Sequence, residues 1–543
     1  MKIIILGAGI AGLATALALT KWLPEAPDIM ILETRPQPST IGGAIGLTPN
    51  AQRCLYHLGV LPRIQTKGLG IVVDKIELFT IYTGTTLGHI DFTGDEGNGL
   101  GEPALKGLRI MRADLLQSLV DAIRSLSNIK LEYGRHPTRI QESPEAVAVD
   151  LVAGTMSADL VVGCDGIHSF TRTTLVDPER IPVYTGIAAV FGFADLQESA
   201  RPPWQDTGLC QSQRGSLMTT YYEATRTRQY VAAIMETKEV LSREGWLAQG
   251  SQQDKIKHDV SSRYAGSAIR FLDPLIEATD HWTLYPVYKL APKGKWCSKR
   301  TILLGDAAHA MPPQGESAGH ALEDAILFAR VMQHSMDKGL DEVFSAYERV
   351  RRGRIDQAYA EAVFGWETQK DSGWFTFVLR NWFTSWIHET KSRTKLRNAD
   401  TRDDHLRGGT PDFQPLYQAT HLTSSHPWPI PGDKPAISTG SMIYAWIMQH
   451  MQKSKVLSIA SGRLITGGMS MSAMLTTRYT HVDALDPSEL IGSQHMSRRI
   501  HGTRYIITRC HTNNVPGDKS NGAYGHMIIE VRHGAPARIG RRA

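Results

Sequence analysis

Three glycine residues near the N terminus have the spacing of a phosphate-binding turn. Gly7, Gly9 and Gly12 follow the apolar run of residues 2–6 and precede a segment rich in alanine and leucine. In such a turn the first glycine allows a tight reversal, the second lets a pyrophosphate approach the backbone, and the third lets helix and strand pack closely. The N terminus of the following helix offers free N–H groups to phosphate oxygens. The spacing predicts a dinucleotide site, although a chance glycine-rich turn before a buried helix has the same appearance.

An acidic residue strengthens this interpretation. Glu33 follows Gly12 by 21 residues and ends the strand-like run of residues 28–33. A carboxylate in that place accepts hydrogen bonds from ribose hydroxyls and disfavours a 2′-phosphate. The pattern therefore favours NAD or FAD over NADP as the ligand of this turn.

Two further acidic residues directly follow strand-like runs. Asp165 stands in an Asp-Gly turn after residues 160–162, although such a pair is by itself commonly no more than a turn. Asp306 follows residues 301–304, and a proline-rich turn then leads to a long helix that begins near residue 317. An ordinary loop between a strand and a helix does not need an acidic residue, a proline-rich turn and a glycine in this order, so the segment is a candidate binding motif.

The third motif favours a flavin. Asp306 is expected to accept hydrogen bonds from the ribityl hydroxyls, and N–H groups near Gly315 and Gly319 are expected to face the pyrimidine edge of the ring. That edge becomes negative on reduction, and a helix N terminus stabilises negative charge. Asp165 is expected to belong to the same cofactor site.

In this order and at these separations, the three motifs resemble those of the class A FAD-dependent monooxygenases, the para-hydroxybenzoate hydroxylase-like family. The resemblance covers about residues 1–400 and is greatest to salicylate hydroxylase-like and fungal secondary-metabolite enzymes, through residues 42–51 and 112–116. It implies FAD-lining positions for five residues, namely Glu33, Gly46, Arg112, Asp306 and Gly319. From the sequence alone, Arg112 is equally compatible with a surface position at a helix start.

The resemblance also implies an activity. FAD is the bound cofactor, NADPH or NADH is a transient cosubstrate, and one oxygen atom of O2 is inserted into a small-molecule substrate. The expected reaction is hydroxylation or epoxidation of an aromatic or unsaturated metabolite in secondary metabolism, and neither a nucleic-acid partner nor a metal is expected. Transient binding of the nicotinamide explains why the chain has one GxGxxG turn.

The substrate residues are less clear from the sequence. Some fungal members of the family hold a phenolate with an arginine and a tyrosine of the substrate lobe. Here Phe191 is expected at the arginine position, and Tyr221 is the candidate catalytic tyrosine, although tyrosines such as Tyr221 and Tyr222 are more often ordinary strand aromatics. Without the cation a phenolate is less stabilised, and epoxidation becomes more plausible.

The elements that position these residues predict an α/β fold with an interrupted Rossmann-like FAD-binding domain. Residues 1–179 and 291–400 form its two parts, and residues 180–290 form an interleaved antiparallel β-sheet lobe that binds substrate. The second part ends in a helical segment. Residues 401–543 are expected to be an irregular, loosely ordered tail.

Local patterns give the individual elements. Thr48 and Pro49 are typical of a helix start, and Gly59 of its end. The remaining predictions are a helix over residues 112–126 and strands near residues 130–133, 146–151, 184–193 and 229–235.

Composition limits the setting. The formal net charge is +5, and residues 411–543 hold about twice as many Lys and Arg as Asp and Glu residues, so the excess lies at this end. The five cysteines are widely spaced and lack CxxC pairs, which favours a reducing, cytoplasmic location over a disulfide framework. No stretch has the roughly 20 apolar residues of a membrane helix.

Two alternatives stay open at this stage. One is a flavin-dependent halogenase, although residues 426–431 lack the first tryptophan of the expected WxWxIP signature. The other is a non-enzymatic flavin-binding protein whose basic tail contacts an acidic partner or a membrane surface.

Overall fold

The computed structural model describes residues 1–39, 42–195, 201–264, 266–313, 317–382 and 384–385, and the backbone of four strands nearer the C terminus. The chain divides into a unit of residues 1–445 and a unit of residues 446–543. Everything that bears on the predicted site lies in the first unit.

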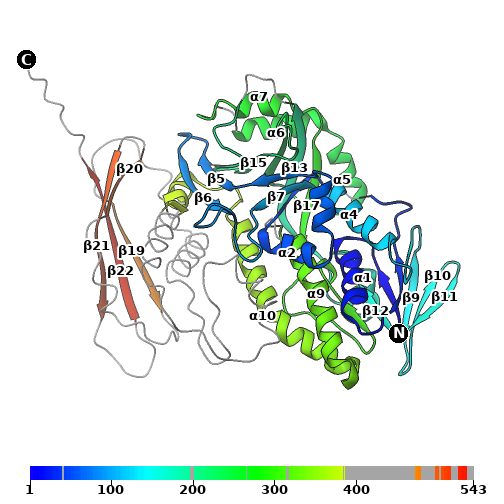
Figure 1. Cartoon of the computed structure of the whole chain (residues 1–543). Helices are drawn as coiled ribbons and strands as arrows, with labels where there is room; N and C mark the ends of the chain where they lie inside the picture. Colours follow the sequence, from blue (N-terminus) through cyan, green and yellow to red (C-terminus); the bar gives the residue numbers. More distant parts are fainter. Residues whose placement is uncertain are drawn as a thin grey trace, which may run out of the picture. The chain divides into compact units, whose positions relative to one another are not determined.

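A five-stranded parallel sheet forms the base of the first unit (Figure 1). Its strand order is β18-β12-β1-β2-β8. The strands are β1 (Lys2–Leu6), β2 (Asp28–Leu32), β8 (Ile129–Glu132), β12 (Leu160–Gly163) and β18 (Thr301–Leu303). Their apolar runs are buried because helices and a small sheet cover the two faces.

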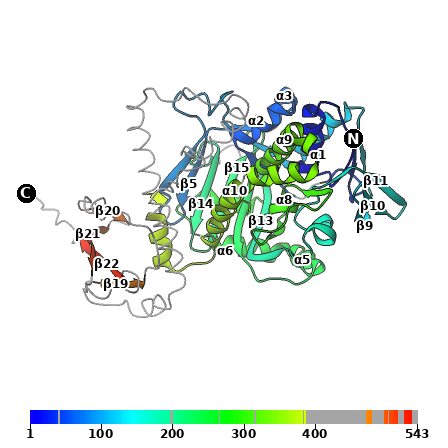
Figure 2. The same cartoon turned by 90° about the horizontal axis from the view of Figure 1, so that it is seen from below.

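Helices form one layer on this sheet. Helix α1 (Ile10–Trp22) packs against α9 (Ser317–Ser335), and α9 in turn packs against α2 (Pro49–His57) and α10 (Leu340–Glu367) (Figure 2). Helix α2 begins as predicted, because the Thr48 side chain accepts a hydrogen bond from the Ala51 N–H and Pro49 occupies the first turn. The other helices nearby are α3 (Leu61–Thr66), α4 (Arg112–Arg124) and the four-residue α8 (Asp306–His309).

Two three-stranded sheets flank this base. The first consists of β9 (Pro137–Glu142), β10 (Val147–Leu151) and β11 (Gly154–Ala158). The second places β7 (Gly107–Met111) between β3 (Ala44–Leu47) and β4 (Ile71–Val73). The second sheet contacts the other lobe, since Arg109 on β7 lies 3.9 Å from the sulfur of Met218.

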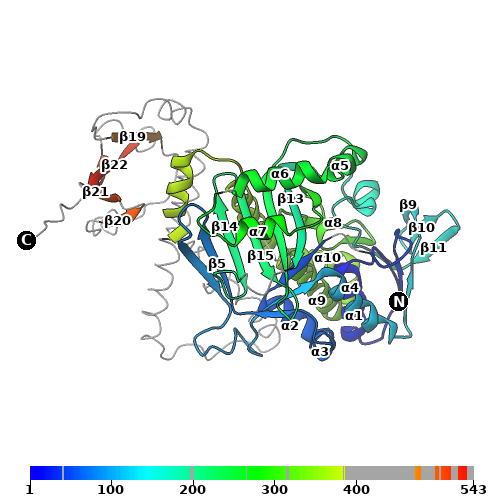
Figure 3. The same cartoon turned by 90° about the horizontal axis from the view of Figure 1, so that it is seen from above.

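That lobe is a seven-stranded sheet in the order β17-β13-β16-β15-β14-β5-β6. Its strands are β5 (Lys75–Thr80), β6 (Thr86–Asp91), β13 (Val183–Asp195), β14 (Thr207–Ser212), β15 (Gly215–Tyr221), β16 (Arg228–Glu236) and β17 (Thr283–Lys289). Helices α6 (Gln253–Tyr264) and α7 (Leu272–Glu277) lie across its outer face, and α5 (Arg243–Gly250) lies beside them (Figure 3).

The sheet has two different faces because successive side chains point to opposite sides. Val190, Leu217 and Val231 belong to the core under α6 and α7. Their neighbours Phe191, Met218 and Tyr230 belong to an aromatic cluster on the other face.

The predicted fold class is confirmed, since a parallel sheet with helices carries an interleaved, mainly antiparallel lobe. The predicted strands and helices are present within a few residues of the expected ends. The sheet also takes in β5 and β6 from the range 1–179, where β5 pairs with β14 in parallel. Among the described residues, no helix combines the length and apolar character needed to cross a membrane.

In the second unit the structure describes a four-stranded antiparallel sheet in the order β19-β22-β21-β20. The strands are β19 (Met471–Arg478), β20 (Met496–Ile500), β21 (Thr503–Asn514) and β22 (Tyr524–Gly534). The loosely ordered tail expected over residues 401–543 stays a prediction, because most of that range lies outside the described residues.

Candidate cofactor and substrate site

The glycine turn after β1 has the geometry that its spacing predicts. Gly7 adopts a φ of +103°, and a Cβ atom there would stand 2.5 Å from the Cys164 carbonyl oxygen. A Cβ on Gly12 would overlap the Gly7 carbonyl oxygen. Apart from Gly9 and its chain neighbours, no atom of the described residues lies within 4 Å of where a Gly9 Cβ would be. The protein itself therefore requires glycine at 7 and 12, whereas at Gly9 it leaves space in front of the backbone.

Glu33 follows β2 and faces this turn. Its Oε2 accepts a hydrogen bond from the Ala8 N–H at 2.9 Å, and its Oε1 accepts one from the Arg35 N–H at 2.9 Å. The carboxylate is half-buried, so it is held beside the start of α1 with part of its surface accessible.

The Asp165 carboxylate accepts hydrogen bonds from residues of its own loop. Its Oδ1 accepts from the Ser169 hydroxyl at 2.5 Å, and its Oδ2 accepts from the N–H and the hydroxyl of Thr171 at 2.8 and 2.9 Å. Burial raises the pKa of this carboxyl, and these hydrogen bonds oppose the shift. That Asp165 belongs to the cofactor site stays a prediction, and these bonds give its carboxylate a part in shaping the turn.

Two buried arginines, to which the sequence pattern assigns no role, connect the acidic turns. The Arg172 guanidinium donates to the carbonyl oxygens of Ile167, Arg180 and Ala307 at 2.6, 2.9 and 3.0 Å. Arg180 donates to Ala308 at 2.7 Å. The loop of Asp165 is thereby tied to the helical turn that begins with Asp306.

Asp306 lies at the first position of α8, directly after Gly305, whose φ is +60°. Its side chain is exposed, unlike its neighbours Ala307 and Ala308. A Cβ on Gly305 would stand 3.0 Å from the Ala11 Cβ, so this turn abuts the start of α1. Asp306 therefore presents an accessible carboxylate beside the glycine turn.

A buried charge network supports the Asp306 turn. Asp324 on α9 accepts from the Gly305 N–H at 2.8 Å and from Arg351 Nε at 2.6 Å, and it lies 2.7 Å from His309 Nε2. Burial works against the Asp324 charge, but His309 and Arg351 outweigh it and lower the pKa of the carboxyl well below its usual range.

A second carboxylate extends this network. Glu323 accepts from Arg351 Nη1 at 2.6 Å and from Arg354 Nη2 at 2.7 Å, and it also accepts from the Asn50 amide. Helices α2, α9 and α10 are therefore joined to one another behind the Asp306 turn. His309 lies within this network, through its contact with Asp324.

The remaining predicted FAD-lining residues occupy different surroundings. Arg112 donates its N–H to the Gly43 carbonyl at 3.1 Å, beside the β3 strand. Gly46 lies on β3 under the Arg109 guanidinium. Gly319 is buried, where a Cβ would stand 3.3 Å from the Ala51 Cβ, so it allows α9 to approach α2. Gly315 lies outside the described residues.

The four turns meet at one edge of the parallel sheet. Gly7, Glu33, Asp165 and Asp306 each follow the carboxyl end of a strand, and those four strands are neighbours in the sheet. Ligands of open α/β sheets bind at such an edge. The open space before Gly9, the accessible carboxylate of Asp306 and the N terminus of α1 fit a dinucleotide with a pyrophosphate.

An aromatic cluster forms where the two lobes contact each other. Its buried members come from β3, β13, β16 and the end of β15, and they are Ala44, Phe191, Tyr222 and Tyr230. Met111, Phe193, Met218 and Ala232 pack against them. The ring of Tyr230 lies 5.8 Å from that of Phe191 and 5.6 Å from that of Phe193.

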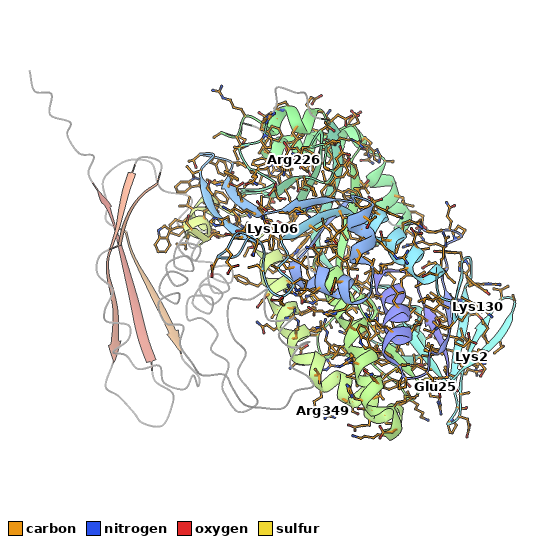
Figure 4. The ribbon with its side chains drawn as sticks, in the orientation of Figure 1. Lys2, Glu25, Lys106, Lys130, Arg226 and Arg349 are labelled. Atoms are coloured by element: carbon orange, nitrogen blue, oxygen red, sulfur yellow. The ribbon has the colours of Figure 1, made fainter. Side chains whose placement is uncertain are left out.

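Tyr221, the predicted catalytic tyrosine, lies on the other face of β15. Its ring packs 5.2 Å from the Arg226 guanidinium carbon, and Arg226 forms an ion pair with Asp206. Arg226 itself is labelled on the lobe of the seven-stranded sheet in Figure 4. The aromatic cluster instead contains Tyr222 and Tyr230. Burial raises the pKa of the Tyr230 phenol to about 12, against a smaller opposing effect of Arg109, so its hydroxyl is protonated at neutral pH.

The chain is similar in sequence to known proteins. Residues 1–362 match the family model described as an FAD binding domain. The chain is 26% identical over 380 residues to the FAD-dependent monooxygenase atnJ of Arthrinium sp, covering 66% of this chain and 83% of that protein. It is 27% identical over 392 residues to salicylate hydroxylase of Pseudomonas putida, covering 68% of this chain and 85% of that protein.

A solved structure shows the same fold. HpxO of Klebsiella pneumoniae, complexed with FAD and uric acid, superposes with a TM-score of 0.59 at 23% identity, over 72% of this chain and 93% of that one. The family model matches most of the chain, and the relatives of the chain named above are a monooxygenase and a hydroxylase. The chain therefore belongs to the FAD binding domain family and is an FAD-dependent monooxygenase.

Proposed function

We propose that this enzyme inserts one oxygen atom of O2 into a small planar aromatic or unsaturated metabolite, at the face where the aromatic cluster meets the FAD-binding lobe. NADPH or NADH supplies two electrons, one oxygen atom goes to the substrate, and the other leaves as water. When bound, FAD supplies the redox chemistry between these reactants. Relatives that act on ring compounds, such as salicylate hydroxylase, support this substrate class.

The observation that carries the proposal is the meeting of two surfaces in one unit. One is the sheet edge with Gly9, Glu33 and Asp306, and the other is the apolar face of β13, β15 and β16. A cofactor held along the edge would present its ring toward a substrate that packs on the aromatic face.

We assign residue roles on this basis. The N–H groups at the start of α1 would hold the pyrophosphate, Glu33 the ribose hydroxyls, and Asp306 the ribityl hydroxyls. Arg112 and the β3 backbone at Gly46 would lie along the ring. Arg172 and the Asp324 network would position these groups without touching the cofactor.

The substrate residues are assigned from the face on which they lie. Tyr230 takes the role that the sequence gave to Tyr221, because its protonated hydroxyl is in the aromatic cluster and can donate to a substrate oxygen. Phe191 and Phe193 pack beside the substrate and exclude water. The wide spacing of the cysteines indicates no disulfide framework and supports a cytoplasmic location for the enzyme.

The experiment combines purified protein, NADPH or NADH, isotopically labelled O2 and a panel of phenols, aromatic acids and alkenes. We expect bound flavin, faster NAD(P)H oxidation with one class of substrate, and a product that carries one labelled oxygen atom. The position of the label distinguishes ring hydroxylation from epoxidation. A protein purified without flavin, or label recovered only in water and peroxide for every compound, would contradict the proposal.

A further inference from the structure

Residues 310–313, here called the proline turn, are attached to α10 at both ends of the turn. At one end, the Trp366 indole N–H donates to the Pro313 carbonyl oxygen at 2.8 Å. Helix α9 begins at Ser317, soon after Pro313 in the sequence. The position of Pro313 therefore bears directly on the position of the α9 N terminus.

The other end of the proline turn is held through a neighbouring segment. Leu290 is fully buried, and its N–H donates to the Ala310 carbonyl oxygen at 3.0 Å. The Tyr359 hydroxyl in turn donates to the Leu290 carbonyl oxygen at 2.6 Å. Tyr359 and Trp366 are two turns apart on α10, so they lie on the same face of this helix. One face of α10 therefore holds both ends of the proline turn.

The Trp366 ring also contacts the lobe of the seven-stranded sheet. The residue is 6% exposed and packs in one cluster with Ile187 of β13 and Val287 of β17. Ile187 and Phe191 are four residues apart on β13, so Trp366 lies on the same face of the sheet as the aromatic cluster. This one side chain thus fixes the proline turn relative to the face that is expected to hold the substrate.

We propose that Trp366 is a positioning residue for the flavin: by holding Pro313 against the substrate lobe, it places the α9 N terminus at the pyrimidine edge of the ring. The inference rests on the proposed function and on the predicted place of that edge near Gly315 and Gly319. The edge becomes negative on reduction, and a helix N terminus stabilises negative charge, so this placement favours the reduced flavin. Tyr359 supports the same placement from the other end of the turn.

The first measurement needs no flavin. Trp366→Phe keeps an aromatic ring in the cluster but loses the indole N–H, so the proline turn should open more often in the apoprotein. We expect hydrogen exchange of the Leu290 amide and of residues 306–311 to be faster by roughly 3- to 10-fold, the effect of about one net hydrogen bond. Tyr359→Phe should have the same effect on the Leu290 amide, and it provides the test if Trp366→Phe does not fold. Unchanged exchange would overturn the proposal.

Trp282→Phe is the matched control. Trp282 is 1% exposed in the core under α6 and α7, and this variant loses the same atoms of a buried indole. It should lower the melting temperature but leave the exchange of the Leu290 amide and of residues 306–311 within about twofold of the wild type. Equally faster exchange in this control would mean that the turn responds to any loss of stability, and the proposal would fall.

The second measurement is the reduction potential of the FAD-bound protein, determined by equilibration with a redox dye. In Trp366→Phe the equilibrium should move roughly 3- to 10-fold toward oxidised flavin, which is a potential more negative by about 15–30 mV for two electrons. Trp282→Phe should keep the wild-type potential. A wild-type potential in Trp366→Phe, together with faster exchange, would mean that Trp366 holds the turn without acting on the flavin, and the proposal would be wrong.

The two proposals can fail separately. Exchange and potential are measured without substrate and O2, so both changes in Trp366→Phe can be present in a protein that forms no oxygenated product. In that case Trp366 is still a positioning residue and the proposed oxygen insertion fails. Labelled product from the substrate panel, with unchanged exchange and potential in Trp366→Phe, would refute the role of Trp366 and leave the oxygen insertion intact.

Discussion

The Nη1 of Arg172 donates to the carbonyl oxygen of Ala307 at 3.0 Å, across a sequence separation of 135 residues. Its other nitrogens donate to Ile167 and Arg180. The loop of Asp165 and the turn of Asp306 belong to strands β12 and β18, which are neighbours in the parallel sheet. Arg172 thus fixes the distance between the Asp165 turn and the Asp306 turn.

Replacing Arg172 by Lys should release this connection. A lysine cannot serve three carbonyl oxygens in the geometry of the guanidinium, so buried acceptors lose their donors at a cost of about 2–4 kcal/mol. We expect a lower melting temperature and a lower flavin-to-protein absorbance ratio after purification. Arg63→Lys on α3, where the side chain is exposed, should change neither value. A variant with full flavin content and wild-type melting temperature would show that Arg172 does not position the turns.

Two glycines of the same turn should respond differently to alanine. A Cβ on Gly12 would overlap the Gly7 carbonyl, so Gly12→Ala should destabilise the protein itself by about 2–4 kcal/mol. Gly9 has a φ of −78°, and beyond its chain neighbours no atom of the described part of the chain lies within 4 Å of its Cβ position, so Gly9→Ala should leave the apoprotein intact. Its methyl group would block a pyrophosphate, and FAD affinity should fall at least roughly tenfold.

The readouts separate these effects. The melting temperature of the apoprotein reports on stability, and quenching of FAD fluorescence reports on affinity. If Gly9→Ala bound FAD as tightly as the wild type, the pyrophosphate would not lie at this backbone.

The sequence predicts the parts of this site that depend on local geometry. The turns at Gly7, Asp165 and Asp306 are correctly placed after strands, because glycine conformations and strand ends are encoded within a few neighbouring residues. The capped start of α2 is recognisable for the same reason.

Long-range partners are not encoded in this way. The bonds of Arg172 to Ala307 and of Arg351 to Asp324 join segments that only the finished topology brings together. Tyr221 and Tyr222 are adjacent, and a strand sends such neighbours to opposite faces, so the choice between them needed the register of the sheet.

Substitutions of Tyr230 and Tyr221 test which face of the seven-stranded sheet binds the substrate. Tyr230→Phe removes a donor in the aromatic cluster and should lower kcat/KM for the best substrate of the panel by roughly 3- to 10-fold, which corresponds to about one neutral hydrogen bond. Tyr221→Phe removes a hydroxyl on the other face of the sheet and should change kcat/KM less than about twofold. Product and NADPH oxidation are both quantified, so that uncoupled oxidation is not counted as turnover. A larger loss in Tyr221→Phe would return the role to Tyr221.

The Asp324 network should make stability depend on acid pH. The carboxyl pKa of Asp324 is lowered in the folded protein, so its contribution is fully present above the unfolded pKa of about 4 and is lost as pH falls toward the folded value. At pH 7, Asp324→Asn should cost about 3–5 kcal/mol, because Arg351 and the Gly305 N–H lose a charged partner. As pH is lowered from 5 to 3, the wild type should lose stability faster than the variant, and the gap in melting temperature should narrow. Asp337→Asn, at an exposed position, should follow the wild type throughout. A gap that stays constant between pH 7 and pH 3 would mean that the Asp324 charge does not stabilise the folded state.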